Sequence, residues 1–363
     1  MMESDPFDCF GSDDGTDTED PEESNIIDSH ENIDHVRDPS CGVCSQLHAE
    51  KTLLMHVKNE LMKRIPKNED VEDDIISKCN YVQGIIDDFC NKRAWMMHIG
   101  PEKGFIMQDA LKKKINEYCN IISQTKRVQE NEMATRFTFT VCELGTYCGY
   151  GSIFLAKTLY EESKKHSNID FHVFTVEINP IFTKVAKELI EICNLHDFIT
   201  ILENELMIDG TVGDNIGSLL KTGIAHHYSL SEDDIPKIDF LLIDHDKDSY
   251  LCDLQTLEKS GMIQEGTVVA ADNVLFAKID NYVSYMKQQH NDGIVSTVTM
   301  ESVVEYSGAD ILNSNEGKEI FKDGIGMNFT HYDIIISFLS LRLSSNHFLY
   351  YQLTTFNIRY HRA

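Results

Sequence analysis

Two short polar clusters directly follow predicted buried strands. Asp244-His245-Asp246-Lys247 comes after the apolar run 238–243, and Asp272-Asn273 comes after the run 267–271. Strands of one parallel sheet open on the same cleft at their carboxyl ends, so these side chains are expected to converge. Two carboxylates and an amide oxygen form a hard donor set, which suits Mg²⁺ with positions left for water and substrate. Each cluster alone could be a helix cap, but together they predict a metal site made of Asp244, Asp272 and Asn273.

Lys247 lies three residues beyond Asp244 in the first cluster. A bound cation nearby favours the neutral amine, which can then accept a proton from a substrate. We therefore interpret Lys247 as a general base.

A glycine-rich turn follows the predicted strand 137–144. From Glu143 to Gly151 it reads E-L-G-T-Y-C-G-Y-G. Glycine lets the backbone come close to a cofactor. The spacing lacks the dinucleotide fingerprint, and no Gly-Lys-Ser/Thr follows as in a phosphate loop. A strand ending in Glu-Leu-Gly suits a cofactor that carries an amino-acid moiety, and the alternative is a plain tight turn.

Glu177 ends the next predicted strand, before Ile178-Asn179-Pro180. An acidic residue at this place can accept hydrogen bonds from both hydroxyls of an adenosine ribose. Ile178 could cover an adenine face. The alternative is a carboxylate that simply favours a helix N-terminus, but its position after the second strand favours the ribose interpretation.

Strands and helices alternate along most of the chain. Helical spacing is seen at 53–62 and 85–90. We expect strands at 137–144, 171–176, 199–202, 238–243, 267–271 and 295–304, and helices at 153–159, 180–193, 249–259 and 279–290. This alternation predicts an α/β fold with a doubly wound, mostly parallel sheet, which is Rossmann-like. Residues 208–234 are interpreted as a long surface insertion.

The two ends of the chain differ from the middle. Residues 1–50 are rich in Asp, Glu and Ser and are expected to be a disordered acidic tail. Cys41, Cys44 and His48 lie there, but zinc would need a second ligand pair, and none is nearby. A single domain is expected at 51–329. For the extension 330–363, a docked strand or helix, a partner segment and an incorrectly predicted gene end all stay open.

Charge and cysteine usage narrow the class of protein. The net charge is −28, from 60 acidic and 32 basic residues, which disfavours nucleic acid and anionic membranes as partners. The ten Cys are scattered through apolar runs, as expected for reduced thiols. Residues 1–50 lack the charged-then-apolar pattern of a signal sequence, and no apolar run reaches about 18 residues, so we expect neither a signal peptide nor a membrane span. We expect a cytoplasmic monomer that acts on a small molecule and has no membrane span.

Several segments, in order, resemble the catechol O-methyltransferase family. The resemblance runs from about 87 to 329, and its markers are W95-M-M with Gly100, K103-G-F-I-M, E143-L-G-T-Y-C-G-Y, E177-I-N-P, I243-D-H-D-K-D, A271-D-N-V and E305-Y. The resemblance implies a methyltransferase with S-adenosylmethionine and Mg²⁺ as cofactors and a catechol-like diol as substrate.

The resemblance also implies roles for individual residues. The metal ligands would be Asp244, Asp272 and Asn273, and the base would be Lys247. Glu305 would hold the hydroxyl that is not methylated, and Trp95 would form a lip of the substrate pocket, with Asp246, Lys247 and Asn273 also beside the substrate. The cofactor would lie against Met97, Ile99, Gly145, Tyr147, Gly149, Ser152, Glu177, Ile178, Asp244 and His245.

Three positions depart from the pattern of the familiar vertebrate enzymes. Asp246 replaces a Trp and Ala277 replaces a Pro, which weakens the hydrophobic gate around the substrate ring. Gly151 stands where a Ser is usual, with Ser152 one place later. Asp246 could favour cationic catechols, or it could turn to solvent or pair with a lysine. Two other functions stay open: a related O-methyltransferase for another phenol, and an inactive S-adenosylmethionine sensor.

Overall fold

The computed structural model describes residues 44–64, 74–128, 137–204, 215–274, 279–302, 305–306 and 332–339. The acidic segment 1–43, with Cys41, and the lip position Ala277 lie outside these ranges. The first helix, α1 (Cys44–Arg64), begins inside the segment 1–50 that we predicted to be tail.

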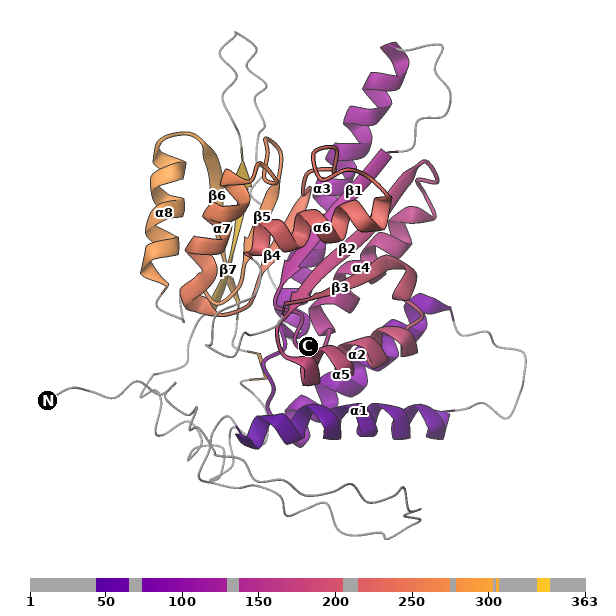
Figure 1. The fold of residues 1–363 in the computed structure, drawn as a ribbon. Helices are drawn as coiled ribbons and strands as arrows, with labels where there is room; N and C mark the ends of the chain where they lie inside the picture. Colours follow the sequence, from indigo (N-terminus) through magenta and orange to yellow (C-terminus); the bar gives the residue numbers. More distant parts are fainter. Residues whose placement is uncertain are drawn as a thin grey trace, which may run out of the picture. The chain divides into compact units, whose positions relative to one another are not determined.

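A seven-stranded sheet has the order β3-β2-β1-β4-β5-β7-β6 (Figure 1). Strands β1 (Phe137–Leu144), β2 (Ile169–Glu177), β3 (Ile199–Glu203), β4 (Phe240–Ile243) and β5 (Val268–Ala271) are parallel. Strand β7 (Tyr332–Leu339) runs antiparallel to both β5 and β6 (Val295–Ser302). The prediction of a doubly wound, mostly parallel sheet is confirmed, with the strand order reversing between β1 and β4.

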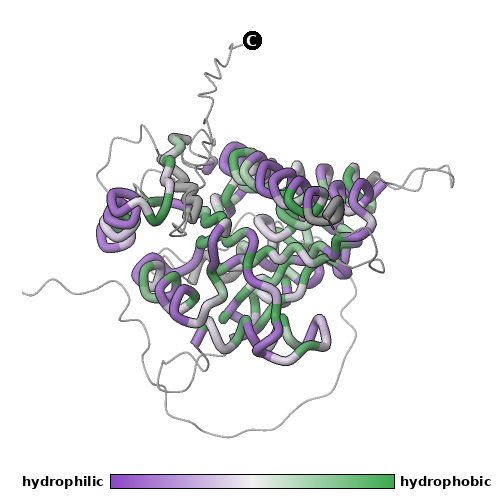
Figure 2. Tube along the Cα trace, turned by 90° about the horizontal axis from the view of Figure 1, so that it is seen from above, coloured by the Kyte–Doolittle hydropathy of each residue, from purple (hydrophilic) through white to green (hydrophobic). Residues whose placement is uncertain are grey.

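The helices cover the two faces of the sheet with separate apolar clusters. One cluster joins the sheet to α1, α2 (Ile75–Lys92), α3 (Gly100–Val128), α4 (Tyr150–Ser163) and α5 (Pro180–Ile192). The other joins it to α6 (Ile216–Tyr228), α7 (Tyr250–Lys259) and α8 (Asp280–Asn291). Hydrophobic segments gather inside and hydrophilic ones along the outer helices (Figure 2). Among the described helices, none combines the length and hydrophobicity that crossing a membrane requires.

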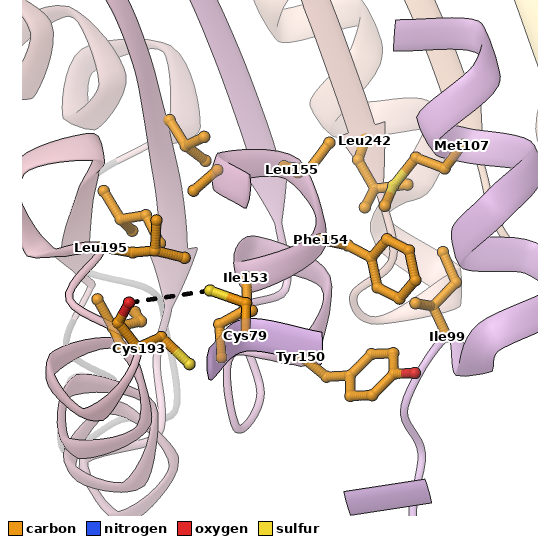
Figure 3. Close-up of a cluster of buried hydrophobic side chains, with 14 of the residues drawn as sticks. Cys79, Ile99, Met107, Tyr150, Ile153, Phe154, Leu155, Cys193, Leu195 and Leu242 are labelled. Carbon is orange, nitrogen blue, oxygen red and sulfur yellow. Dashed lines mark hydrogen bonds between the residues drawn. The ribbon is translucent and has the colours of Figure 1, made fainter. Parts of the chain in front are cut away.

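Adjacent strand residues alternate between the two clusters. Val141 and Leu242 face the α4 side, whereas Cys142 and Leu241 face the α6 side. This alternation follows from the two-residue period of a strand. Figure 3 shows the α4 side, where Ile153, Phe154 and Leu155 lie among side chains from helices and strands, and the Cys79 thiol donates to the carbonyl oxygen of Cys193 at 3.8 Å.

Two sequence interpretations change. The supposed surface insertion 208–234 contains α6, whose Ile216, Leu220 and Ile224 are buried in the core, so this part is a crossover helix between β3 and β4. Asn215 is the N-cap of α6, and its side chain accepts from the backbone N–H of Ser218 at 3.0 Å. In the extension 330–363, the structure shows a docked strand, β7, within the sheet.

Candidate active site

The predicted polar residues gather at the carboxyl ends of the parallel strands. Asp244 follows β4, Asp272 follows β5, and Glu177 ends β2. The backbone ties these ends together, because Asp244 N donates to Leu144 O at 2.9 Å and Asp272 N donates to Ile243 O at 3.0 Å. The loops therefore lie on either side of the point where the strand order reverses, where parallel sheets bind ligands.

A buried lysine joins two of the expected carboxylates. Lys103 Nζ lies 2.7 Å from Asp272 Oδ1 and 2.6 Å from Asp272 Oδ2, and it also forms an ion pair with Glu305. Asn273 Nδ2 lies 3.5 Å from Glu305 Oε1, so the amide belongs to the same group. Asn273 has a positive φ of 58°, a conformation that asparagine adopts more readily than most residues.

Asp244 and Lys247 form a second pair beside the first. Lys247 Nζ donates to Asp244 Oδ1 at 3.0 Å and to the Tyr250 hydroxyl at 2.7 Å. Tyr250 in turn donates to the carbonyl oxygen of Asp272 at 3.2 Å. This tyrosine thus links the loop after β4 to the loop after β5.

Burial raises the pKa of the Asp244 carboxyl. The ammonium of Lys247 opposes that shift, the Asp272 carboxylate adds to it, and Lys103 opposes it. The two aspartates therefore repel each other and are balanced by two lysines. A dication at this place would therefore compete with the two ammonium groups for these carboxylates.

The Glu305 backbone is held by the proposed lip residue. Trp95 Nε1 donates to Glu305 O at 3.0 Å. The next residue, Tyr306, donates its hydroxyl to Asp87 Oδ1 at 2.9 Å, and Tyr150 donates to the same oxygen at 2.8 Å. Helix α2 and the start of α4 thus fix the segment that carries Glu305.

Glu177 is largely buried, and its carboxylate accepts three backbone N–H groups. The donors are Tyr147 at 2.7 Å, Ile178 at 3.0 Å and Asn179 at 2.9 Å. Burial raises its pKa, and the hydrogen bonds from the backbone lower it. The carboxylate thereby joins the glycine loop after β1 to the end of β2 and the start of α5.

The glycines of the loop after β1 allow close approach. Gly145 has φ +100°, and a Cβ there would overlap the carbonyl oxygen of Asp244. Gly149, with φ +85°, is the N-cap of α4, where a Cβ would press on Ala186 at 3.2 Å. Only glycine allows this loop to pack directly on the loop after β4.

Substituting Gly145 by Ala should therefore lower the free energy of unfolding by roughly 2–5 kcal/mol, from backbone strain and overpacking. Urea unfolding monitored by circular dichroism measures this change. Gly84→Ala is the matched control, since Gly84 is exposed in α2 with nothing within 4 Å of a new Cβ. The control should gain up to about 1 kcal/mol from helix propensity. Equal midpoints for both variants would contradict the close approach at Gly145.

Ser152, expected near the cofactor, directs its hydroxyl elsewhere. It donates to Glu143, which also accepts from Thr175 at 2.6 Å. Burial raises the pKa of Glu143 to about 8, and the Ser152 and Thr175 hydroxyls oppose the shift. A Cβ at Gly151 would overlap Glu143 Oε1. Thus glycine at 151, with serine at 152, makes room for this buried carboxyl, whose position the sequence analysis left without a role.

The other expected residues have mixed surroundings. Met97 is 49% exposed and Ile178 is 42% exposed, so both large apolar side chains are open to solvent. Ile99 is buried.

His245 pairs with Asp253 through Nε2 at 2.7 Å and stacks on Tyr250. Asp246 is exposed and accepts from the Ser249 hydroxyl at 2.7 Å, which is the solvent-facing alternative set out above.

Within the described part of the chain, no group of three or more His, Cys, Asp or Glu side chains is placed to hold a metal. The expected donors are two carboxylates and an amide, and Lys103 lies on one of those carboxylates. Sequence reasoning did not assign Lys103 a role, although its position in the motif K103-G-F-I-M could have drawn attention to it.

Comparison with known proteins supports the resemblance. A family model described as O-methyltransferase matches residues 137–295. This segment of the chain thus resembles the O-methyltransferase family. Catechol O-methyltransferase of Bos taurus is 27% identical over 206 residues, which cover 57% of this chain and 59% of the relative. Catechol O-methyltransferase B of Danio rerio is 28% identical over 225 residues, covering 62% of this chain and 67% of the relative.

The chain thus spans about three fifths of the length of the bovine relative. The resemblance found in the sequence motifs is confirmed at the level of the family. Among solved structures, an O-methyltransferase of Bacillus cereus in complex with SAH aligns with a TM-score of 0.41 and 15% identity, over 80% of this chain and all of that one.

Proposed function

We propose that this protein is an O-methyltransferase that transfers a methyl group from S-adenosylmethionine to one hydroxyl of a catechol, with Mg²⁺ as cofactor. The observation that carries the proposal is the meeting of Asp244, Lys247, Asp272, Asn273 and Glu305 at the strand ends. A diol needs both an acceptor for its proton and a partner for its second oxygen, and this group supplies both.

The chemistry of the donor set fits Mg²⁺. Asp244, Asp272 and the amide oxygen of Asn273 are the residues that would hold the ion, and their mutual repulsion favours a dication. When bound, Mg²⁺ would act as a Lewis acid that stabilises the negative charge developing on the substrate oxygen. Because Lys103 already contacts Asp272, the ion would share that carboxylate with an ammonium.

The remaining steps rest on the chain itself. Lys247, held by Asp244 and Tyr250, would accept the hydroxyl proton at Nζ. Glu305 would accept from the second hydroxyl and so decide which oxygen reacts. Trp95, with its indole N–H fixed on Glu305 O, would cover the ring. Positioning of this kind can supply on the order of 7–11 kcal/mol in a displacement reaction.

For the cofactor, Glu177 would accept from the ribose hydroxyls, while Ile178 would cover the adenine. Tyr147 and Gly149 would line the methionine end, with Met97, Ile99 and His245, whereas the Ser152 hydroxyl is already bonded to Glu143. The carboxylate of Glu177 is already held in place by three backbone donors, which supports a role as a fixed acceptor.

Glu177→Ala should therefore weaken S-adenosylmethionine binding by about 1.5–3 kcal/mol, the range for hydrogen bonds to a charged group. Isothermal titration calorimetry with the full chain measures the affinity. Glu188→Ala, on the exposed side of α5 where Glu188 pairs with Lys58, is the control and should leave the affinity unchanged. Equal affinities in wild type and Glu177→Ala would remove this residue from the cofactor site.

One assay separates the candidate functions. Transfer of labelled methyl to a panel of diols and larger phenols, with and without Mg²⁺, distinguishes a catechol enzyme from a related O-methyltransferase. Cofactor binding without transfer to any acceptor would favour the sensor. The retained Lys247 and Glu305 support an active enzyme.

Any preference for cationic catechols that Asp246 gives the enzyme would be weak, since that carboxylate is exposed and screened. A cytoplasmic monomer remains part of the proposal.

A further inference from the structure

The pairing of Lys103 with two carboxylates gives this residue a function of its own. Lys103 is 1% exposed and lies in the first turns of α3. Its Nζ contacts both oxygens of Asp272 and also Glu305, which come from different parts of the sheet edge. Charge-assisted bonds of this kind are short and directional, so they can hold the two carboxylates in one arrangement.

Within the described residues, the Glu305 carboxylate is held mainly by Lys103. Among the contacts described for its carboxylate, the other is the long 3.5 Å approach of Asn273 Nδ2. Its backbone is fixed independently, by Trp95 at Glu305 O and by Tyr306 on Asp87. Loss of the Lys103 ammonium would therefore release the carboxylate of Glu305 while leaving the segment that carries it in place.

Lys103 and Lys247 also occupy different positions. Lys103 is enclosed and directed at carboxylates, whereas the side chain of Lys247 is 29% exposed and lies against Asp244. We propose that Lys103 is a positioning residue that joins Asp272 to Glu305 and so fixes where the second substrate hydroxyl is held. This inference rests on the proposed function, because it assigns Glu305 to that hydroxyl.

The test compares Lys103→Met, which removes the charge, with Lys103→Arg, which keeps it. The first readout is the ratio of the two monomethyl products from a catechol with one ring substituent. The ratio should fall by about fivefold or more in Lys103→Met, because an interaction as strong as a charged hydrogen bond is lost. Lys103→Arg should stay near the wild-type ratio. A merely structural lysine would lower the yield and leave the ratio unchanged.

The second readout does not depend on turnover. Mn²⁺ binding, followed by electron paramagnetic resonance, should be roughly tenfold tighter in Lys103→Met, since a positive charge next to Asp272 is gone. Lys103→Gln is measured in parallel, because its amide can still donate to a carboxylate if the methionine variant does not fold. In variants that fold, an unchanged product ratio overturns the proposal. If the wild type methylates no diol, the proposed function is wrong and the positioning role of Lys103 is overturned with it, whereas a diol-methylating wild type with an unchanged product ratio in Lys103→Met overturns the role of Lys103 alone.

Discussion

Replacing Lys247 by methionine should lower methyl transfer by about 10²–10⁴-fold, the usual contribution of a general base. Methionine keeps most of the bulk of the side chain but has no proton acceptor. The Asp244 and Tyr250 contacts of Nζ would be lost, while the glycine loop and Glu177 would keep their partners. Turnover should fall in a single-turnover assay, and S-adenosylmethionine affinity, measured by calorimetry, should stay the same.

Lys259→Met is the matched control, since Lys259 is exposed in the last turn of α7, at the opposite end of that helix from the cleft. It should keep the wild-type rate. If Lys247→Met also reacts at the wild-type rate, solvent takes the proton and Lys247 is not the base. Lys103 is poorly suited to replace it, because its Nζ is enclosed by carboxylates.

The sheet could be predicted because its signals are local. The run 240–243 is buried on both faces, as a central parallel strand must be, and its uninterrupted apolar residues indicate this in the sequence. The start of α5 was equally clear, since Asn179 caps the helix by accepting from Ile181 N at 2.9 Å and Pro180 occupies the first turn. The convergence of Asp244 and Asp272 could also be predicted, because the carboxyl ends of parallel strands lie at the same edge of the sheet.

The parts that were missed depend on contacts between distant residues. Helix α6 contains Gly217 and Gly223 and is preceded by a polar stretch, so its sequence suggested a loop. Tertiary packing decides otherwise, because Leu220 and Ile224 find a complementary face on the sheet. Strand β7, near the far end of the chain, pairs with β5. The local sequence of β7 does not indicate which strand it pairs with.

In the site, too, contacts between distant residues could not be predicted from the sequence. Asp244 and Asp272 could be chosen from their positions after strands, but the partner of Asp272 comes from α3, 169 residues away in the sequence. Glu143 was part of a recognised motif, yet its burial against Ser152 and Thr175 depends on the absence of a side chain at Gly151. The spacing of residues in the sequence predicts which side chains could bind a metal. The residues that hold those side chains in place are identified only from the packing in the structure.

Removal of divalent metal should abolish methyl transfer, and added Mg²⁺ should restore it. The reason is that Asp244, Asp272 and Asn273 offer only oxygen donors, the ligands that Mg²⁺ prefers. Treatment with EDTA followed by gel filtration and an assay with labelled cofactor tests this. Ca²⁺ should support less turnover, because its looser coordination would place a diol less accurately. Full activity after exhaustive chelation would exclude a metal from the reaction.

A binding measurement then assigns the ion to these residues. Asp272→Asn should weaken Mn²⁺ binding, followed by electron paramagnetic resonance, by about 10–100-fold, since the variant loses a charged oxygen donor. Asp109→Asn, at an exposed position of α3, makes the same substitution away from the cleft and should bind as the wild type does. The variant Asp272→Asn also frees Lys103 from one partner, so thermal unfolding is recorded for both proteins. Weaker Mn²⁺ binding in a folded Asp272→Asn places the ion at the end of β5, and equal binding in both variants would place it elsewhere.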